Sequence, residues 1–238
     1  MKKFIPIAAI AMMFGFVACE SEEVAFDSSS DVFVISKTVE TENEVDTLYG
    51  LALHVFANKP IKSAAVTAED QTEYTLEAFQ GYSLDFYYET PESEFSTEKP
   101  LVGSYSFDIL AESAETEKAV DNLTEDMIYP TDGIVSTFDA EEVSMTLSWT
   151  EIEGADYVIV KMFENDEDQT QVYQSQTQKG DTKEFVVKGS GAGWKADFTP
   201  ELDDNFIVEL HAFKYEPGKV GVNLQAKTIN TKAVVWNE

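Results

Sequence analysis

The residues of this chain that could do chemistry are few in kind and scattered. Cys19 is the single cysteine, and the two histidines, His54 and His211, each lie in a strand-like pattern without a second histidine at metal-ligand spacing. No nucleophile elbow, H-E-x-x-H, P-loop or dinucleotide-binding glycine pattern is present. Glycoside hydrolysis needs only a pair of carboxylates. Because the chain has 45 acidic residues, some pair will lie close together in any fold, so a close pair does not indicate a glycosidase. The sequence therefore predicts a protein that is not an enzyme and has no cofactor or metal site.

The charge of the chain restricts its partners. It has 45 acidic residues against 16 basic ones, all lysines, and a net charge of −29. Such a chain repels nucleic acid phosphates and anionic lipid headgroups, so we expect no nucleic acid partner and no membrane attachment through a basic face. The acidic run "ENDEDQT" offers oxygen ligands at Asn165, Asp166 and Asp168 but lacks the glycine and distal glutamate of an EF-hand. We interpret it as a solvated loop, with calcium binding as the alternative.

The N-terminus has the layout of an export signal. Lys2 and Lys3 precede an almost unbroken apolar run from Phe4 to Val17. That run has about 14 residues, whereas a membrane-spanning helix needs about 20. The segment is therefore predicted to direct export rather than to anchor the chain as a helix.

The residues that follow bear a specific resemblance. Phe16-Val17-Ala18-Cys19 resembles a bacterial lipobox, although Phe16 departs from the usual leucine. The resemblance implies cleavage before Cys19 and a thiol carrying diacylglycerol, which makes outer-membrane lipid a partner of the protein. Glu20-Ser21-Glu22-Glu23 is similar to the surface-export tag of Bacteroides-type lipoproteins. Together they imply a lipid-anchored outer-membrane protein that faces the cell surface.

The rest of the chain predicts an all-β fold. Aromatic and β-branched residues recur in short runs separated by turn residues, which is typical of β-sandwiches. We expect two consecutive antiparallel β-sandwich domains, with a boundary at Pro130-Thr131-Asp132-Gly133. The predicted segments are a signal peptide (1–18), an acylated flexible tether (19–31), an Ig-like sandwich (32–130) and a fibronectin type III-like sandwich (131–238).

One strand of the first half supports this assignment. In "VGSYSFDI" the residues Tyr105, Phe107 and Ile109 alternate with polar ones, so they should share one face. The piece "GSYSF" is similar to the G-x-Y-x-F strand of bacterial Ig-like modules. Ser113 to Asp126 is different, because Val120, Leu123 and Met127 are spaced three and four apart. A short helix and an irregular crossover are both open for that segment.

The second half carries the more extensive resemblance. "SMTLSWT" alternates Met145, Leu147 and Trp149, and "EIEGADYVIVKMFE" then turns at a glycine into a strand. From Gly133 to Trp236 this resembles a fibronectin type III module, although Phe206 stands where that family usually has the tyrosine of its corner. The resemblance implies a sandwich and is silent about function.

Two groups of aromatic residues are candidates for ligand binding. Trp194 follows a glycine-rich run in "KGSGAGWKADF", and a tryptophan on such a loop could stack on a sugar ring. The alternative is that Trp194 begins the next strand and points into the core. Tyr82, Tyr87 and Tyr88 form the second candidate cluster, in "GYSLDFYYE".

Three functional interpretations follow. The first is a non-catalytic surface lipoprotein that binds a glycan or protein, as an accessory to nutrient uptake. The second is a structural or adhesive subunit similar to fimbrial lipoproteins, although a chain without arginine cannot mature by cleavage after arginine. The third, a surface hydrolase, lacks a catalytic frame. Thr47, in Asp46-Thr47-Leu48, is similar to the O-glycosylation site of Bacteroides-type exported proteins.

Overall fold

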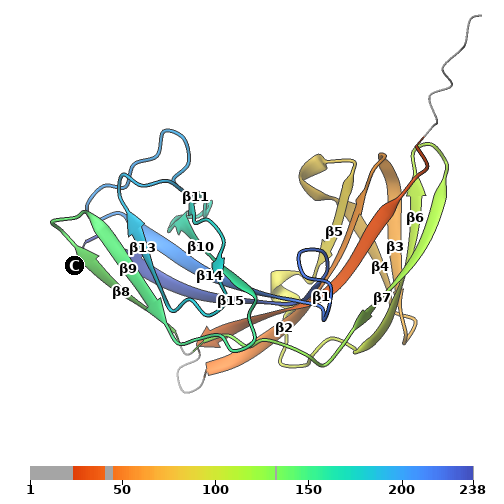
Figure 1. Ribbon diagram of the computed structural model, residues 1–238, viewed down its shortest axis with the longest axis horizontal. Helices are drawn as coiled ribbons and strands as arrows, with labels where there is room; N and C mark the ends of the chain where they lie inside the picture. Colours follow the sequence, from red (N-terminus) through yellow and green to blue (C-terminus); the bar gives the residue numbers. More distant parts are fainter. Residues whose placement is uncertain (1–23, 41–44, 132, 238) are drawn as a thin grey trace, which may run out of the picture.

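The computed structural model describes residues 24–40, 45–131 and 133–237, and it shows a two-lobed protein built almost entirely of β-strands (Figure 1). The predicted signal peptide and Cys19 lie outside the described residues. In the part of the chain that is described, no helix has the length and apolar character needed to cross a membrane. The predicted all-β fold with antiparallel sheets is confirmed.

The first half forms a sandwich around its own core. Tyr105, Phe107 and Ile109 are buried in it on one face of their strand, as the alternation predicted. The strands are β1 (Ser28–Glu40), β2 (Val45–Ala57), β3 (Ile61–Ala68), β4 (Glu73–Ala78), β5 (Asp85–Glu89), β6 (Gly103–Ala111) and β7 (Thr116–Leu123), with 3-10 turns η1 (Phe79–Gly81) and η2 (Glu92–Glu94). They are hydrogen-bonded in the order β1-β2-β5-β4-β3-β6-β7.

The second half is a three-stranded sheet packed on the rest of its strands. Met145, Leu147 and Trp149 point from β9 into the core between the two layers, as predicted. The strands are β8 (Ile134–Asp139), β9 (Ser144–Trp149), β10 (Tyr157–Glu164), β11 (Gln171–Gln174), β12 (Gln178–Lys179), β13 (Glu184–Lys188), β14 (Asn205–Tyr215) and β15 (Leu224–Val235). The small sheet has the order β13-β9-β8, and β11-β10-β14-β15 form the layer opposite.

The two halves are joined through their main chains. β1 pairs with β15 in parallel, in the register Val34↔Ala226 to Lys37↔Ile229, so one sheet runs through both halves. This contact involves nearly opposite ends of the chain, which meet at the middle of Figure 1. The relative position of the halves therefore depends on a strand pairing as well as on the segment that links β7 to β8.

Two local expectations differ from the structure. The first strand begins at Ser28 instead of Val32, because Ser28 to Asp31 continue the pairing with β2. The expectation of a helix or an irregular crossover within Ser113–Asp126 is wrong, because Thr116–Leu123 form strand β7. The spacing of its apolar residues was misleading: Leu123 is buried, whereas Val120 is 61% exposed on the other face.

Candidate functional site

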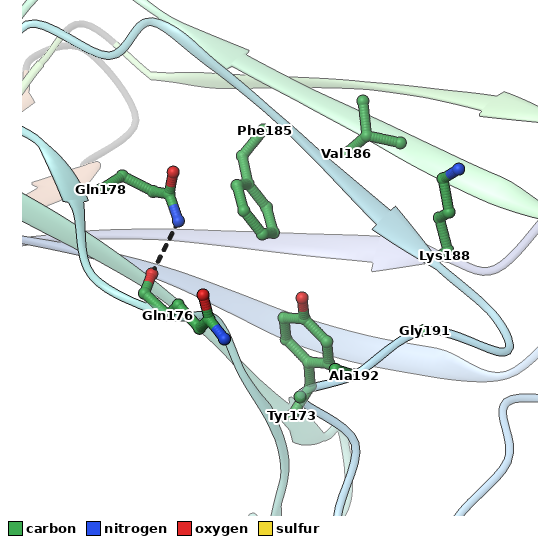
Figure 2. Close-up of a pocket in the computed structure, with 9 residues that line it drawn as sticks. Tyr173, Gln176, Gln178, Phe185, Val186, Lys188, Gly191 and Ala192 are labelled. Atoms are coloured by element: carbon green, nitrogen blue, oxygen red, sulfur yellow. Dashed lines mark hydrogen bonds between the residues drawn. The ribbon is translucent and has the colours of Figure 1, made fainter.

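A groove of about 370 Å³ opens at one edge of the second half (Figure 2). We call it the glutamine groove and define it by Tyr173, Gln176, Gln178, Phe185, Lys188 and the loop 191–193. Figure 2 shows the two glutamines on one side, Phe185 of β13 facing them, and the ring of Tyr173 between Gln176 and Ala192. The groove thus combines two aromatic rings with two primary amides.

A break in strand pairing brings the glutamines to the groove. β11 pairs with β10 as far as Gln174, and then Ser175 turns inward and is buried. The backbone N–H of Ser175 donates to the carbonyl of Val160 at 2.8 Å, and the N–H of Val160 donates to the Ser175 hydroxyl at 3.0 Å. Because side chains alternate along an extended chain, Gln174 and Gln176 face outward.

The glycine-rich loop closes the other side of the groove. Gly193 has a φ of +110°, which L side chains rarely adopt, and a Cβ there would lie 2.5 Å from Cε2 of Tyr173. The carbonyl of Gly193 accepts a 2.9 Å hydrogen bond from the N–H of Gln174. Glycine at this position therefore lets the loop pack directly on Tyr173.

The structure places Trp194 beside the groove and not in its lining. Its indole is partly buried against the core of the second half and stacks on Phe198, with ring centroids 5.4 Å apart. The edges of Tyr173 and Trp236 approach it at 4.9 and 5.6 Å. Its Nε1–H donates to the carbonyl of Lys188 at 2.8 Å. Trp194 thus supports the loop that borders the groove, and a direct contact with a sugar stays a prediction.

The charge of the groove contrasts with that of the chain. None of its nine lining residues is acidic, although Asp and Glu make up 45 of the 238 residues. Its one charged side chain is Lys188, which is exposed. Burial raises the pKa of Tyr173, so its hydroxyl stays protonated and can donate a hydrogen bond. Figure 2 marks the hydrogen bond from Nε2 of Gln178 to the backbone carbonyl of Gln176, and the N–H of Gly191 donates to the carbonyl of Lys188 at 3.0 Å.

The three predicted tyrosines do not form one site. Tyr82 is 64% exposed in the loop before β5. Tyr87 and Tyr88 are neighbours on β5 and therefore point to opposite faces of the sheet. Tyr88 packs on the first core next to Tyr74, with ring centroids 5.1 Å apart, whereas Tyr87 lines a cavity between the two halves.

The remaining candidate residues are placed as follows. Thr47 lies on β2 opposite Thr38 and is half-buried. The run "ENDEDQT" forms the turn between β10 and β11, where the carboxylate of Asp166 accepts hydrogen bonds from the N–H groups of Asp168 and Gln169. That pattern is typical of a solvated turn.

One group of carboxyls was not recognised from the sequence. Asp31, Asp121 and Glu216 have oxygen atoms that all lie within 4.8 Å of one another, and the two aspartates are buried. The N–H groups of Leu224 and Val32 donate to Asp31 and Asp121, respectively. Burial raises the pKa of Asp31 to about 8 and that of Glu216 to about 7. At neutral pH the cluster therefore holds protons, which reduces the repulsion between its members.

Comparisons with known proteins bear on the fold alone. No family model and no curated protein matches the chain. Solved structures align over most of its length at low similarity. A cytokine receptor complex is 13% identical, with a TM-score of 0.31, over 86% of this chain and 96% of that chain. A two fibronectin type-III domain segment of chicken tenascin is also 13% identical, with a TM-score of 0.31, over 88% and 99%.

A third match is the central fibronectin-III array of RIM-binding protein. It is 11% identical, with a TM-score of 0.29, over 84% of this chain and 66% of that chain. The second and third of these structures are made of fibronectin type III domains. Similarity this low carries no argument about ligand or activity.

Proposed function

We propose that this protein is a non-catalytic surface lipoprotein that binds a neutral glycan in the glutamine groove. The observation that carries the proposal is a concave site free of acidic side chains, with aromatic rings and amides, on a strongly acidic chain. Protein or glycan capture at the cell surface would suit an accessory role in nutrient uptake.

The chemistry of the groove suits a sugar. Sugar rings present C–H groups that pack on aromatic faces, and the half-buried Phe185 offers such a face. Sugar hydroxyls both donate and accept hydrogen bonds, as do the primary amides of Gln176 and Gln178. A pocket with an apolar lining and a few convergent polar groups is the usual form of a ligand site.

A glycan array probed with the full chain tests this function. Neutral oligosaccharides should give the strongest signals. Gln176→Ala and Tyr173→Phe should each weaken binding about threefold to tenfold, because each removes one hydrogen-bonding group. Gln174→Ala is the matched control, since Gln174 is an exposed glutamine on the same segment but outside the lining. An array without a neutral binder, or an equal loss with Gln174→Ala, would count against the groove.

The lipid anchor is a separate proposal that rests on the sequence around Cys19. If the lipobox resemblance is correct, Cys19→Ser should remain an uncleaved precursor and lose membrane association. Labelled palmitate should enter the unaltered protein and not the variant. Palmitate incorporation into Cys19→Ser would contradict lipid attachment at this residue.

A further inference from the structure

A second cavity, of about 530 Å³, lies where the two halves meet, and we call it the junction cleft. Strands β1, β2 and β5 and the turn η1 line one side, while β10, the end of β14, the β14–β15 loop and β15 line the other. In Figure 1 that loop stands between the two lobes, next to β1. The cleft is distinct from the glutamine groove, with which it shares no lining residue.

Main-chain contacts hold the two sides of the cleft together. The parallel pairing of β1 with β15 runs beneath it. At its floor the N–H of Leu224 donates to the carboxyl of Asp31, at 3.0 Å to the nearer oxygen. Phe33 and Leu224 pack in the small apolar cluster that covers this junction. The cleft is therefore formed before any ligand arrives.

Aromatic rings line both sides of the cleft. On the first half, Phe79 and Tyr87 meet edge to face, with ring centroids 5.6 Å apart. On the second half, Tyr157 stacks on Phe213 at 4.5 Å and lies 5.3 Å from Tyr215. The face of an aromatic ring carries partial negative charge and attracts cations. Two aromatic walls therefore make a favourable place for a positive group.

The charged side chains of the cleft add to this preference. Asp85 and Glu89 contribute carboxylates and Asp31 contributes a carboxyl group that holds a proton at neutral pH, whereas Lys227 is the one lysine in the lining. Lys227 is half-buried, and the nearby carboxylates of Glu89 and Glu209 offset part of its charge, whereas Lys161 adds to the local positive charge. Nε2 of His54 lies 2.8 Å from Oδ1 of Asp85, at a position that is partly open to solvent.

From this arrangement we infer that the junction cleft is a second binding site, which takes a small organic ammonium compound. The alkyl groups of the ammonium would contact the rings of Phe79, Tyr87 and Tyr157. The carboxylate of Asp85 would balance its charge. This inference does not depend on glycan binding in the glutamine groove.

Choline and 3,3-dimethylbutan-1-ol test it directly, because they have nearly the same shape and only choline is charged. Calorimetric titration of the full chain should show choline binding about tenfold more tightly, as expected for a cation between partly desolvated rings. Equal affinities, or no choline binding at millimolar concentrations, would overturn the inference.

Variants locate the binding. Phe79→Ala and Asp85→Asn should each weaken choline binding about threefold or more, since each removes part of the cation site. Tyr82→Ala and Asp108→Asn are the controls: Tyr82 is exposed in the same loop as Phe79, and Asp108 is exposed on β6. Melting curves establish that all four variants fold. If the controls weaken choline as much as the cleft variants do, choline is binding to the acidic surface and the inference fails.

Discussion

The glutamine groove and the junction cleft are built in opposite ways. The groove is made by one stretch of chain, residues 173–193, at the edge of the second half, and its lining has no acidic residue. The cleft takes residues from both halves, between Asp31 and Lys227, and combines aromatic rings with three carboxyls. A strongly acidic chain can therefore have cavities of different chemistry. We expect the charge of a ligand to decide whether it binds in the groove or in the cleft.

The largest expected effect concerns the stability of the second half, which carries the whole groove and one side of the cleft. Trp149 is 7% exposed in the second core, so Trp149→Ala should lower the free energy of unfolding by about 3–5 kcal/mol. Glycan binding should be lost with the fold of the second half. Urea denaturation measures the change, with the exposed Val135→Ala as a control that should stay within about 0.5 kcal/mol. A Trp149 variant as stable as that control would contradict its place in the core.

A smaller loss is expected at Trp194, whose ring is only partly buried. Trp194→Ala should cost about 1–3 kcal/mol, because it removes aromatic contacts and the hydrogen bond to Lys188. It should also weaken glycan binding, since the loop 191–193 loses its support, and leave choline binding unchanged. A variant with unchanged stability and weaker glycan binding would instead indicate that the ring contacts the sugar.

The smallest effect concerns pH and the carboxyls near the cleft. In the folded protein the pKa of Asp31 is raised to about 8 and that of Glu216 to about 7. The stability that these two groups contribute is therefore complete below their unfolded pKa values near 4. It falls as the pH rises and is lost once the pH has passed 7 and 8. Burial lowers the pKa of His211 to about 4. This histidine therefore makes the fold more stable as the pH rises, but only up to its ordinary pKa of 6.5. The melting temperature should therefore decline from roughly pH 5 to pH 8, most steeply above about pH 6.5, and level off above pH 8.

Asp31→Asn provides the comparison for that decline, because it removes the ionisation and keeps the shape. Its melting temperature should depend less on pH, and glycan binding in the acid-free groove should not change across the same range. If calcium raised the melting temperature of the unaltered protein strongly at pH 8, and Asp31→Asn abolished this, the cluster would bind metal rather than protons.

Much of the fold followed from alternation along single strands. Met145, Leu147 and Trp149 on β9 are such a case, because the alternation of apolar and polar residues along a strand indicates which of its faces is buried. The pairing of β1 with β15 could not be predicted, because the residues of one strand do not indicate which distant strand it pairs with. The spacing of Val120 and Leu123 fitted a helix, and a strand was not expected there because its pairing with β6 is a contact that local spacing does not reveal.

The sites were predictable to different degrees. The glycine-rich loop was recognised as unusual, and the alternating glutamines of "QVYQSQTQ" were a signal that could have located the groove. Tyr87 and Tyr88 could have been assigned to opposite faces from the two-residue period alone. The junction cleft was not predictable, because Phe33, Tyr87 and Tyr157 meet only through the pairing of strands from both halves.

Amide resonances of the labelled full chain test the central claim, that the two cavities bind ligands of different charge. The strongest neutral oligosaccharide from the array should shift resonances within residues 174–193. Choline should shift those of β5 and of residues 221–227, and each ligand should bind with undiminished affinity in the presence of the other. Shifts of one common set of residues by both ligands, or competition between them, would contradict the account.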